Sequence, residues 1–230
     1  MTLLLFALTI IPSALLLIYI KKKNNYTSQP TSLIIKLIIL GMLTCLPAYV
    51  FETVLDYAFL SILDSLTIYN FLSSFVTCGF IEEILKFLVL YYLTDKYNQY
   101  YRTVYDGIIY SVCVALGFAV LEDILYIFIY YGGDLAVALL RAVTPGHFCF
   151  SIFMGMFLSE AKKYENFDEY KHHKYMVLSI LIPALIHGLY DYCLFNGSPL
   201  FIVFFILLLI SLYVFVYKTI KKISNEIFFI

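Results

Sequence analysis

Long apolar runs fill most of this 230-residue sequence and leave short polar connections between them. A helix of about 20 apolar residues can cross a bilayer, and the sequence contains about seven runs of that length. Hydrophobic residues form 63% of the chain and charged residues 13%, whereas soluble domains average about 45–50% and about 25%. We therefore predict an all-α, polytopic transmembrane helix bundle. The expected spans are roughly residues 2–20, 33–51, 66–93, 104–130, 134–158, 174–195 and 200–217.

Basic residues occur in every second loop. The run 21–23 is all lysine and follows the first span, and the loops after the third, fifth and seventh spans are also basic. The intervening loops lack Lys and Arg, and the loop expected after the second span carries Glu52, Asp56 and Asp64. Because Lys and Arg are enriched in cytoplasmic loops, we predict an N-terminus outside the membrane and a cytoplasmic C-terminus.

The net charge and the spacing of the cysteines exclude three classes of protein. A net charge of -1 leaves no basic face of the density that nucleic-acid binding requires, so we expect no nucleic-acid partner. The five cysteines are scattered singly through apolar runs without a Cys-x-x-Cys pair. This pattern fits neither a zinc ribbon nor a disulfide framework.

Two adjacent carboxylates, Glu82 and Glu83, interrupt the third apolar run. An acidic residue at the centre of a membrane helix costs about 2.5–3.5 kcal/mol on insertion scales, and such residues usually serve a function. Lys86 follows them at a spacing that places all three side chains on one helical face. A buried salt bridge that only fixes helix packing is the alternative interpretation. Lys86 is expected to support the pair in either case.

Three further polar clusters lie in the next three spans, and they contain Glu122 and Asp123, then Arg141 with His147, then His187 with Asp191. Counted from the predicted cytoplasmic ends, the glutamates and histidines lie about 15 to 27 Å deep at 1.5 Å per helical residue. Unrelated ion pairs have no reason to share a depth. We therefore predict one polar cavity among spans three to six.

The two histidines have different local settings. His187 and Asp191 are four residues apart, so both point to the same side of a helix, where the carboxylate can orient the imidazole. The sequence Pro145-Gly146 directly before His147 should interrupt its helix and free backbone groups that need partners in the protein or water. A broken helix beside a histidine suggests a hydrated site.

Glu122 and Asp123 are adjacent and therefore point about 100° apart on a helix. We assign Glu122 to the cavity, because Phe118 lies one turn earlier on the same face. Asp123 is expected to meet a neighbouring helix near Arg141.

Two hydrolytic schemes are open for these side chains. In the first, Glu122, His147 and His187 bind zinc, and the Glu82 and Glu83 pair supplies a base. In the second, a carboxylate activates water without a metal while His187 and Asp191 stabilise the oxyanion. The sequence contains no His-Glu-x-x-His motif, the commonest helical zinc signature.

The order and spacing of these motifs resemble those of the PrsW family of intramembrane proteases over residues 70–195. The matching elements are Glu82-Glu83-Ile84-Leu85-Lys86, then Tyr105-Asp106-Gly107 leading to Gly117-Phe118-Ala119-Val120-Leu121-Glu122-Asp123-Ile124-Leu125-Tyr126, then Arg141 with Pro145-Gly146-His147, and finally His187-Gly188-Leu189-Tyr190-Asp191. The related CAAX prenyl proteases have His in the second motif, where this chain has Glu122. Asp123 is a departure, since many family members have Asn there.

The resemblance implies a site-1-type protease of the bacterial cytoplasmic membrane that cleaves a single-span anti-sigma factor. Carried over by position, Glu82, Glu83, Glu122, His147 and His187 form the catalytic set. We expect residues 66–195 to be the catalytic core, residues 1–65 to form scaffold or substrate-entry helices, and residues 196–230 to form a last span with a cytoplasmic tail. The sequence leaves the oligomeric state open.

Two other classes of function compete with a protease. A proton- or cation-coupled transporter can use the same midplane carboxylates and histidines as a relay. That interpretation predicts a water path to both faces and repeated halves, and the sequence shows no internal repeat. A membrane scaffold with buried ion pairs leaves the shared depth unexplained.

Overall fold

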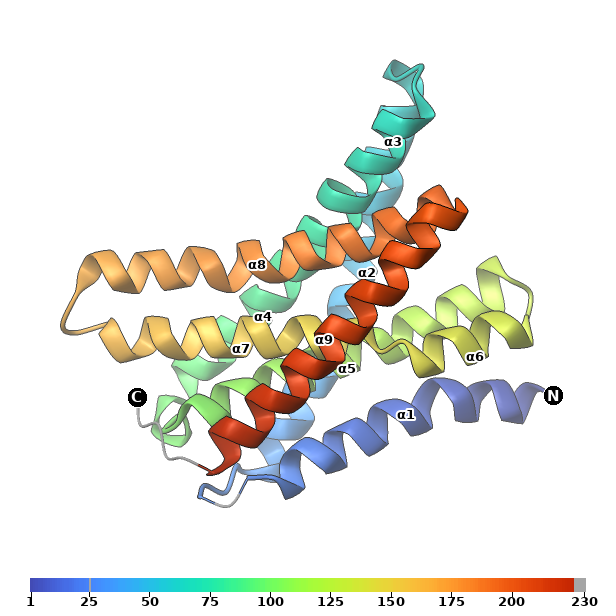
Figure 1. The fold of residues 1–230 in the computed structure, drawn as a ribbon. Coiled ribbons are helices and arrows are strands. Elements are labelled where there is room, and N and C mark those ends of the chain that lie inside the picture. The colour runs from blue at the N-terminus through green and yellow to red at the C-terminus, as the bar shows by residue number, and fades with distance from the viewer. Residues whose placement is uncertain (25, 226–230) are drawn as a thin grey trace.

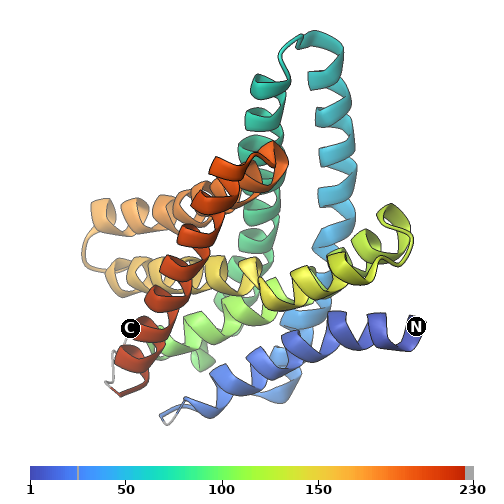
Figure 2. The ribbon, with the colours of Figure 1, turned by 45° about the vertical axis from the view of Figure 1, so that its right-hand side comes forward.

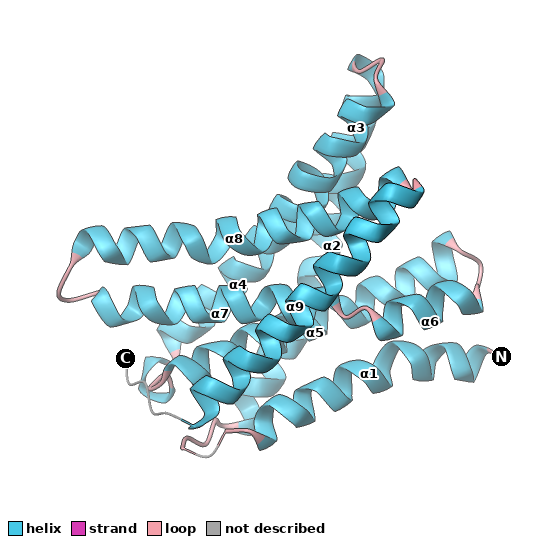
Figure 3. Ribbon diagram, in the orientation of Figure 1, coloured by secondary structure: helices cyan, strands magenta, loops and turns pink. Residues whose placement is uncertain are grey.

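The computed structural model describes residues 1–24 and 26–225, and within these residues it contains helices and loops but no β-strand (Figures 1 and 3). The all-α prediction is confirmed. The elements are α1 (Thr2–Lys22), α2 (Thr31–Ile62), α3 (Leu66–Leu72), the π-helix η1 (Ser73–Glu82), α4 (Glu83–Lys96), the 3-10 helix η2 (Asn98–Tyr100), α5 (Val104–Leu125), the π-helix η3 (Tyr126–Tyr130), α6 (Leu135–Val143), α7 (Gly146–Tyr164), α8 (Glu169–Asn196) and α9 (Pro199–Asn225).

Six helical stretches in the described chain are long and apolar enough to cross a membrane. They are Thr2–Lys22, Thr31–Ile62, Val104–Tyr130, Leu135–Tyr164, Glu169–Asn196 and Pro199–Ser224. The remaining expected span is present as consecutive helical elements, α3, η1 and α4, but Glu82, Glu83 and Lys86 reduce its apolar character. The predicted polytopic bundle is therefore confirmed. Residues 226–230 of the predicted cytoplasmic tail lie outside the described residues.

Successive connections alternate between two sides of the bundle. Figures 1 and 2 show the α1–α2, α4–α5 and α7–α8 connections and the C-terminal end of α9 on one side. The N-terminus and the α2–α3, η3–α6 and α8–α9 connections lie toward the other side. This alternation agrees with the alternation of basic loops in the sequence. The cytoplasmic assignment of the basic side stays a prediction.

Helix α5 lies at the centre of the bundle. All of its residues from Val104 to Ala119 are buried, as expected for a helix that is apolar all round. Gly155 of α7 lies so close to α5 that a Cβ atom there would stand 2.6 Å from the carbonyl oxygen of Gly107. Small residues at such crossings let helix backbones approach in a membrane protein. Helix α7 is thereby held directly against α5.

The π-helix η1 meets α8 in a similar way. A Cβ atom on Gly79 would stand 2.6 Å from the carbonyl oxygen of Ala184 and 2.9 Å from the backbone nitrogen of Gly188. This close approach brings the end of η1 next to the turn of α8 that carries His187. A long π-helix is rare, and π-helical turns are frequent at functional sites.

The predicted interruption before His147 is confirmed, because α6 ends at Val143 and α7 begins at Gly146. Two tyrosine hydroxyls donate hydrogen bonds to carbonyl groups near this break. The Tyr190 hydroxyl lies 3.0 Å from the carbonyl oxygen of Thr144, and the Tyr213 hydroxyl lies 2.6 Å from that of Val143. Irregular backbone at membrane depth requires such partners within the protein.

Candidate active site

The glutamate pair lies at the junction of η1 and α4 and is almost completely buried, with exposed fractions of 3% for Glu82 and 1% for Glu83. Lys86, also buried, lies one turn further along α4. Its Nζ atom donates to Glu82 Oε2 at 3.0 Å and to Glu83 Oε1 at 2.9 Å. The predicted pairing within one helical face is confirmed, and one ammonium group compensates two carboxylates.

His147 links this triad to α5. Its Nδ1 atom lies 3.0 Å from Lys86 Nζ, and its Nε2 atom lies 2.7 Å from Glu122 Oε2. Because the ammonium group has only hydrogens to donate, Nδ1 accepts, and the proton of the neutral ring lies on Nε2 facing Glu122. Glu122 and Lys86 therefore contact opposite nitrogens of the His147 ring.

Arg141 of α6 compensates the two acids of α5. Its Nη2 atom lies 2.5 Å from Glu122 Oε2, and its Nε atom donates to Asp123. The predicted contact between Asp123 and Arg141 is confirmed. The ring of Phe118 lies 5.3 Å from that of His147, which agrees with the predicted placement of Glu122 on the histidine side of α5.

His187 of α8 completes the centre. Its Nδ1 atom lies 3.1 Å from Glu83 Oε1, and its Nε2 atom lies 3.2 Å from Asp191 Oδ2. The predicted His187 and Asp191 pair is therefore present. Each histidine has Nε2 toward a carboxylate, Glu122 or Asp191. The Nδ1 atoms differ, because that of His187 faces Glu83 whereas that of His147 accepts from Lys86 and lies 4.0 Å from Glu82 Oε2.

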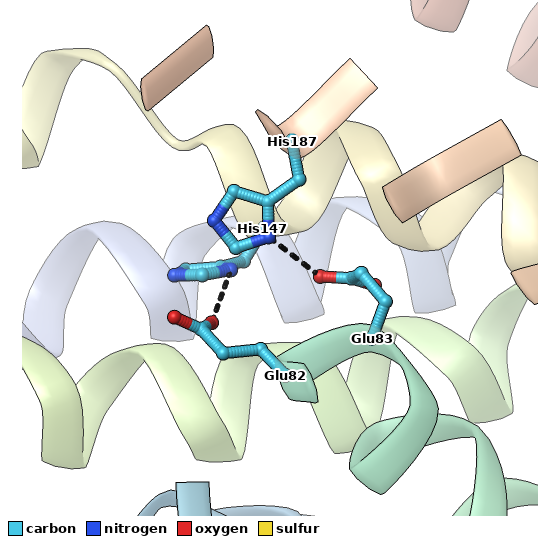
Figure 4. A group of neighbouring side chains, drawn as sticks. All are labelled: Glu82, Glu83, His147 and His187. Atoms are coloured by element: carbon cyan, nitrogen blue, oxygen red, sulfur yellow. Dashed lines mark hydrogen bonds and ion pairs between the residues drawn. The ribbon is translucent and has the colours of Figure 1, made fainter. Parts of the chain in front are cut away.

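Figure 4 shows four side chains that converge at the centre of the site: Glu82, Glu83, His147 and His187. Each offers one ligand atom, and these four atoms lie within 4.8 Å of one another. Two imidazole nitrogens and two carboxylate oxygens form a donor set that suits zinc. Histidines that bind a metal usually donate their other ring nitrogen to a carboxylate or carbonyl group, as the positions of Glu122 and Asp191 allow. The residues present therefore fit a zinc ion.

Two cavities reach this centre. The first, of about 260 Å³, is bordered by α1, α5, α6, α7 and α8, and its lining includes Glu82, Glu122 and both histidines. The second, of about 180 Å³, is bordered by α2, η1, α5 and η3. Glu82 and Glu122 line both cavities, whereas the lining of neither includes Glu83. The polar space therefore extends beyond spans three to six, to the walls formed by α1 and α2.

The sequence interpretation placed Glu52 and Asp56 in a loop, and this placement was wrong. Both residues belong to α2, which continues to Ile62, and both line the second cavity. No Pro or Gly follows residue 51 before the helix ends, so nothing in the local sequence stops the helix there. The four-residue spacing of the two acids was the available signal that they share a helical face.

The chain is similar to known proteins over most of its length. The family described as PrsW family intramembrane metalloprotease matches residues 29–218. The chain is 34% identical over 200 residues to Protease PrsW of Halalkalibacterium halodurans, with 86% of each chain covered. It is 35% identical over 193 residues to Protease PrsW of Clostridioides difficile, covering 83% of this chain and 79% of the relative. No solved structure matches the chain.

A third relative, Protease PrsW of Bacillus subtilis, is 32% identical over 189 residues, with 80% of each chain covered. These relatives are bacterial proteases, and the matched region contains every residue of the site described above. The chain is thus a multi-pass bacterial membrane protein and a membrane-embedded endopeptidase. On the family match and on the extent of these similarities, it belongs to the PrsW family of intramembrane metalloproteases.

Proposed function

We propose that this chain is a zinc-dependent endopeptidase that hydrolyses a peptide bond of a single-span membrane protein. An anti-sigma factor is the substrate that the family resemblance implies. The observation that carries this proposal is the position of Glu82. This carboxylate borders both cavities and lies beside His147 and His187. The Nε2 atom of each histidine faces a second carboxylate, Glu122 or Asp191.

We assign His147, His187 and Glu83 as the zinc ligands. Their ligand atoms belong to the converging group, and Glu83 is the carboxylate that lines neither cavity. Three protein ligands and one open position are typical of catalytic zinc sites. This set differs from the sequence prediction, in which Glu122 took the third place. Glu122 faces the Nε2 atom of His147, so we assign it to orienting that ring.

Zinc, when bound, supplies a Lewis acid for the carbonyl group of the scissile peptide bond. Glu82 then takes a proton from the attacking water and returns it to the nitrogen of the leaving amine. Glu82 suits this role because its carboxylate faces cavity space that water and substrate can enter. Asp191 and Glu122 keep the imidazoles in a fixed orientation, and Arg141 holds Glu122 in place.

The first cavity is the proposed substrate site. Its walls combine apolar residues of α1 and α6, such as Leu8 and Leu140, with the non-helical stretch at Thr144 and Pro145. An extended peptide can lie there with its backbone near Glu82 and the histidines. We assign the N-terminal stretch 1–65 to the walls of the two cavities, since α1 borders the first and α2 the second.

Two conservative variants test this division of roles. Glu82→Gln should retain zinc and lose cleavage of a co-expressed single-span substrate, because it lacks only the base. Glu83→Gln should lose both zinc and cleavage, because it lacks a ligand. Zinc content is measured by elemental mass spectrometry on the purified protein, and insertion is checked by membrane fractionation.

His187→Ala should insert and fold but should not cleave the substrate. Cleavage retained in both Glu83→Gln and His187→Ala would contradict the peptidase site. A wild-type protein that cleaves its substrate without any bound metal would instead support activation of water by a carboxylate alone.

A further inference from the structure

One face of α2 borders the second cavity. The residues of this face recur at helical spacing, with Tyr49, Glu52, Thr53 and Asp56 all lining the cavity. Val54, next to them in the chain, is 61% exposed and lies outside the lining. Helix α2 therefore turns a polar stripe toward the cavity and an apolar surface away from it, toward the expected position of the lipid.

Among the described residues, the two acids on this stripe have no cationic partner. Asp56 Oδ1 accepts a hydrogen bond from the Ser73 hydroxyl at 2.9 Å. Neither Glu52 nor Asp56 forms an ion pair with any residue in the described part of the chain. A buried carboxylate is costly unless it is paired or hydrogen-bonded. Both acids border the second cavity, so water in this cavity would supply the missing partners.

The cavity has room for this water and leads to the catalytic base. Its volume of about 180 Å³ is many times the ~10–15 Å³ that one water molecule needs. Its lining includes Glu82, which also lines the first cavity. Figure 2 shows α2 and α3 projecting from the bundle as a helical hairpin, so the outer turns of α2 extend beyond most of the other helices.

Hydrolysis consumes one water molecule for each peptide bond. A peptide in the first cavity blocks the approach to Glu82 from that side, so water needs a second route. We propose that the cavity between α2 and η1 is a water passage, lined by Glu52, Thr53 and Asp56, that supplies Glu82 while substrate occupies the first cavity. This role rests on the proposed function, but the hydration of the passage can be measured without cleavage.

The first test compares two neighbouring positions of α2 in a variant whose five native cysteines are replaced by alanine. Thr53→Cys and Val54→Cys are each introduced and treated in intact membranes with a charged methanethiosulfonate reagent that cannot cross a bilayer. Thiols react as thiolates, which form in water and not in lipid. Position 53 should react at least tenfold faster than position 54, although both are exposed on the helix. Equal rates, or a faster reaction at position 54, would overturn the passage.

The second test measures continuity with the site. Cys78 lines both cavities and is kept as the sole cysteine. With a single-span substrate bound in the first cavity, replacing Glu52 and Asp56 by leucine should lower the labelling rate of Cys78 at least tenfold, because the passage is then the remaining route and becomes apolar. An unchanged rate with substrate bound would refute the proposal. Neither test uses cleavage, so a failed passage is distinguishable from a failed peptidase assignment.

Discussion

Replacement of Lys86 by methionine tests how the site keeps its charges in the membrane. Methionine has nearly the length and volume of lysine, so the change removes the ammonium group and leaves little cavity. The variant leaves Glu82 and Glu83 buried without their common cation, and it removes the hydrogen bond to His147. We expect a large loss of stability from this single position.

The magnitude follows from burial. Lys86 is 1% exposed, and its carboxylate partners are 3% and 1% exposed. Removing one partner of a buried ion pair costs about 3–5 kcal/mol, because the remaining charge stays desolvated. Here two carboxylates lose their cation together, so we expect a loss near the upper end of this range. Lys96, exposed at the end of the same helix, provides the control, since substitutions of exposed residues usually change stability by about 0.5 kcal/mol or less.

The free energy of unfolding is measured for both variants by titration with sodium dodecyl sulfate in mixed micelles, with helicity followed by circular dichroism. Zinc is added in a parallel series. It should stabilise Lys86→Met more than it stabilises the wild type, because lysine and a metal ion draw on the same carboxylates. Equal stability of Lys86→Met and Lys96→Met would refute the view that Lys86 compensates the buried acids.

Three further outcomes are expected. Wild-type protein should contain about one zinc ion per chain, as the proposed mononuclear site requires. A variant with both His147→Ala and His187→Ala should contain none. Equal zinc in the two proteins, measured by elemental mass spectrometry, would contradict the ligand assignment. Glu122→Gln should retain the fold and lower the rate of substrate cleavage about 10- to 100-fold, because it weakens the orientation of His147; an unchanged rate would contradict that role. Gly155→Ala should destabilise the protein by about 1–3 kcal/mol, because the Cβ of the new alanine would press on the backbone of Gly107. The same titration with sodium dodecyl sulfate measures this loss of stability. An unchanged midpoint would contradict the close contact.

The local pairs of the site were predictable from sequence because each lies within one helix. Lys86 reaches Glu82 and Glu83 across one turn, and Asp191 reaches His187 in the same way. Helical geometry alone places such side chains on one face. The convergence of four spans was also predictable, because hydropathy and basic loops give each residue a depth, and the depths agreed.

The contacts between helices were less predictable. His147 and Lys86 are 61 residues apart, and His187 and Glu83 are 104 residues apart. Depth says nothing about the direction in which each helix turns its side chains. Glu122 was therefore placed correctly in the cavity. Its depth could not show that it faces Nε2 of His147 and leaves Nδ1 toward Lys86 and the glutamate pair.

The π-helix η1 explains why the direction of the Glu82 and Glu83 side chains could not be predicted from the sequence. Facing positions on a helix are deduced from a period of 3.6 residues, but a π-helix closes hydrogen bonds over five residues and has a different period. The helical face assigned to residues before Ser73 therefore does not predict which way the side chain of Glu82 points. Gly79, which allows the contact with α8, fixes the rotation of this segment instead. The position of both glutamates thus depends on a tertiary contact, so a sequence reading can identify the acids that enter the site but cannot assign one as base and the other as ligand.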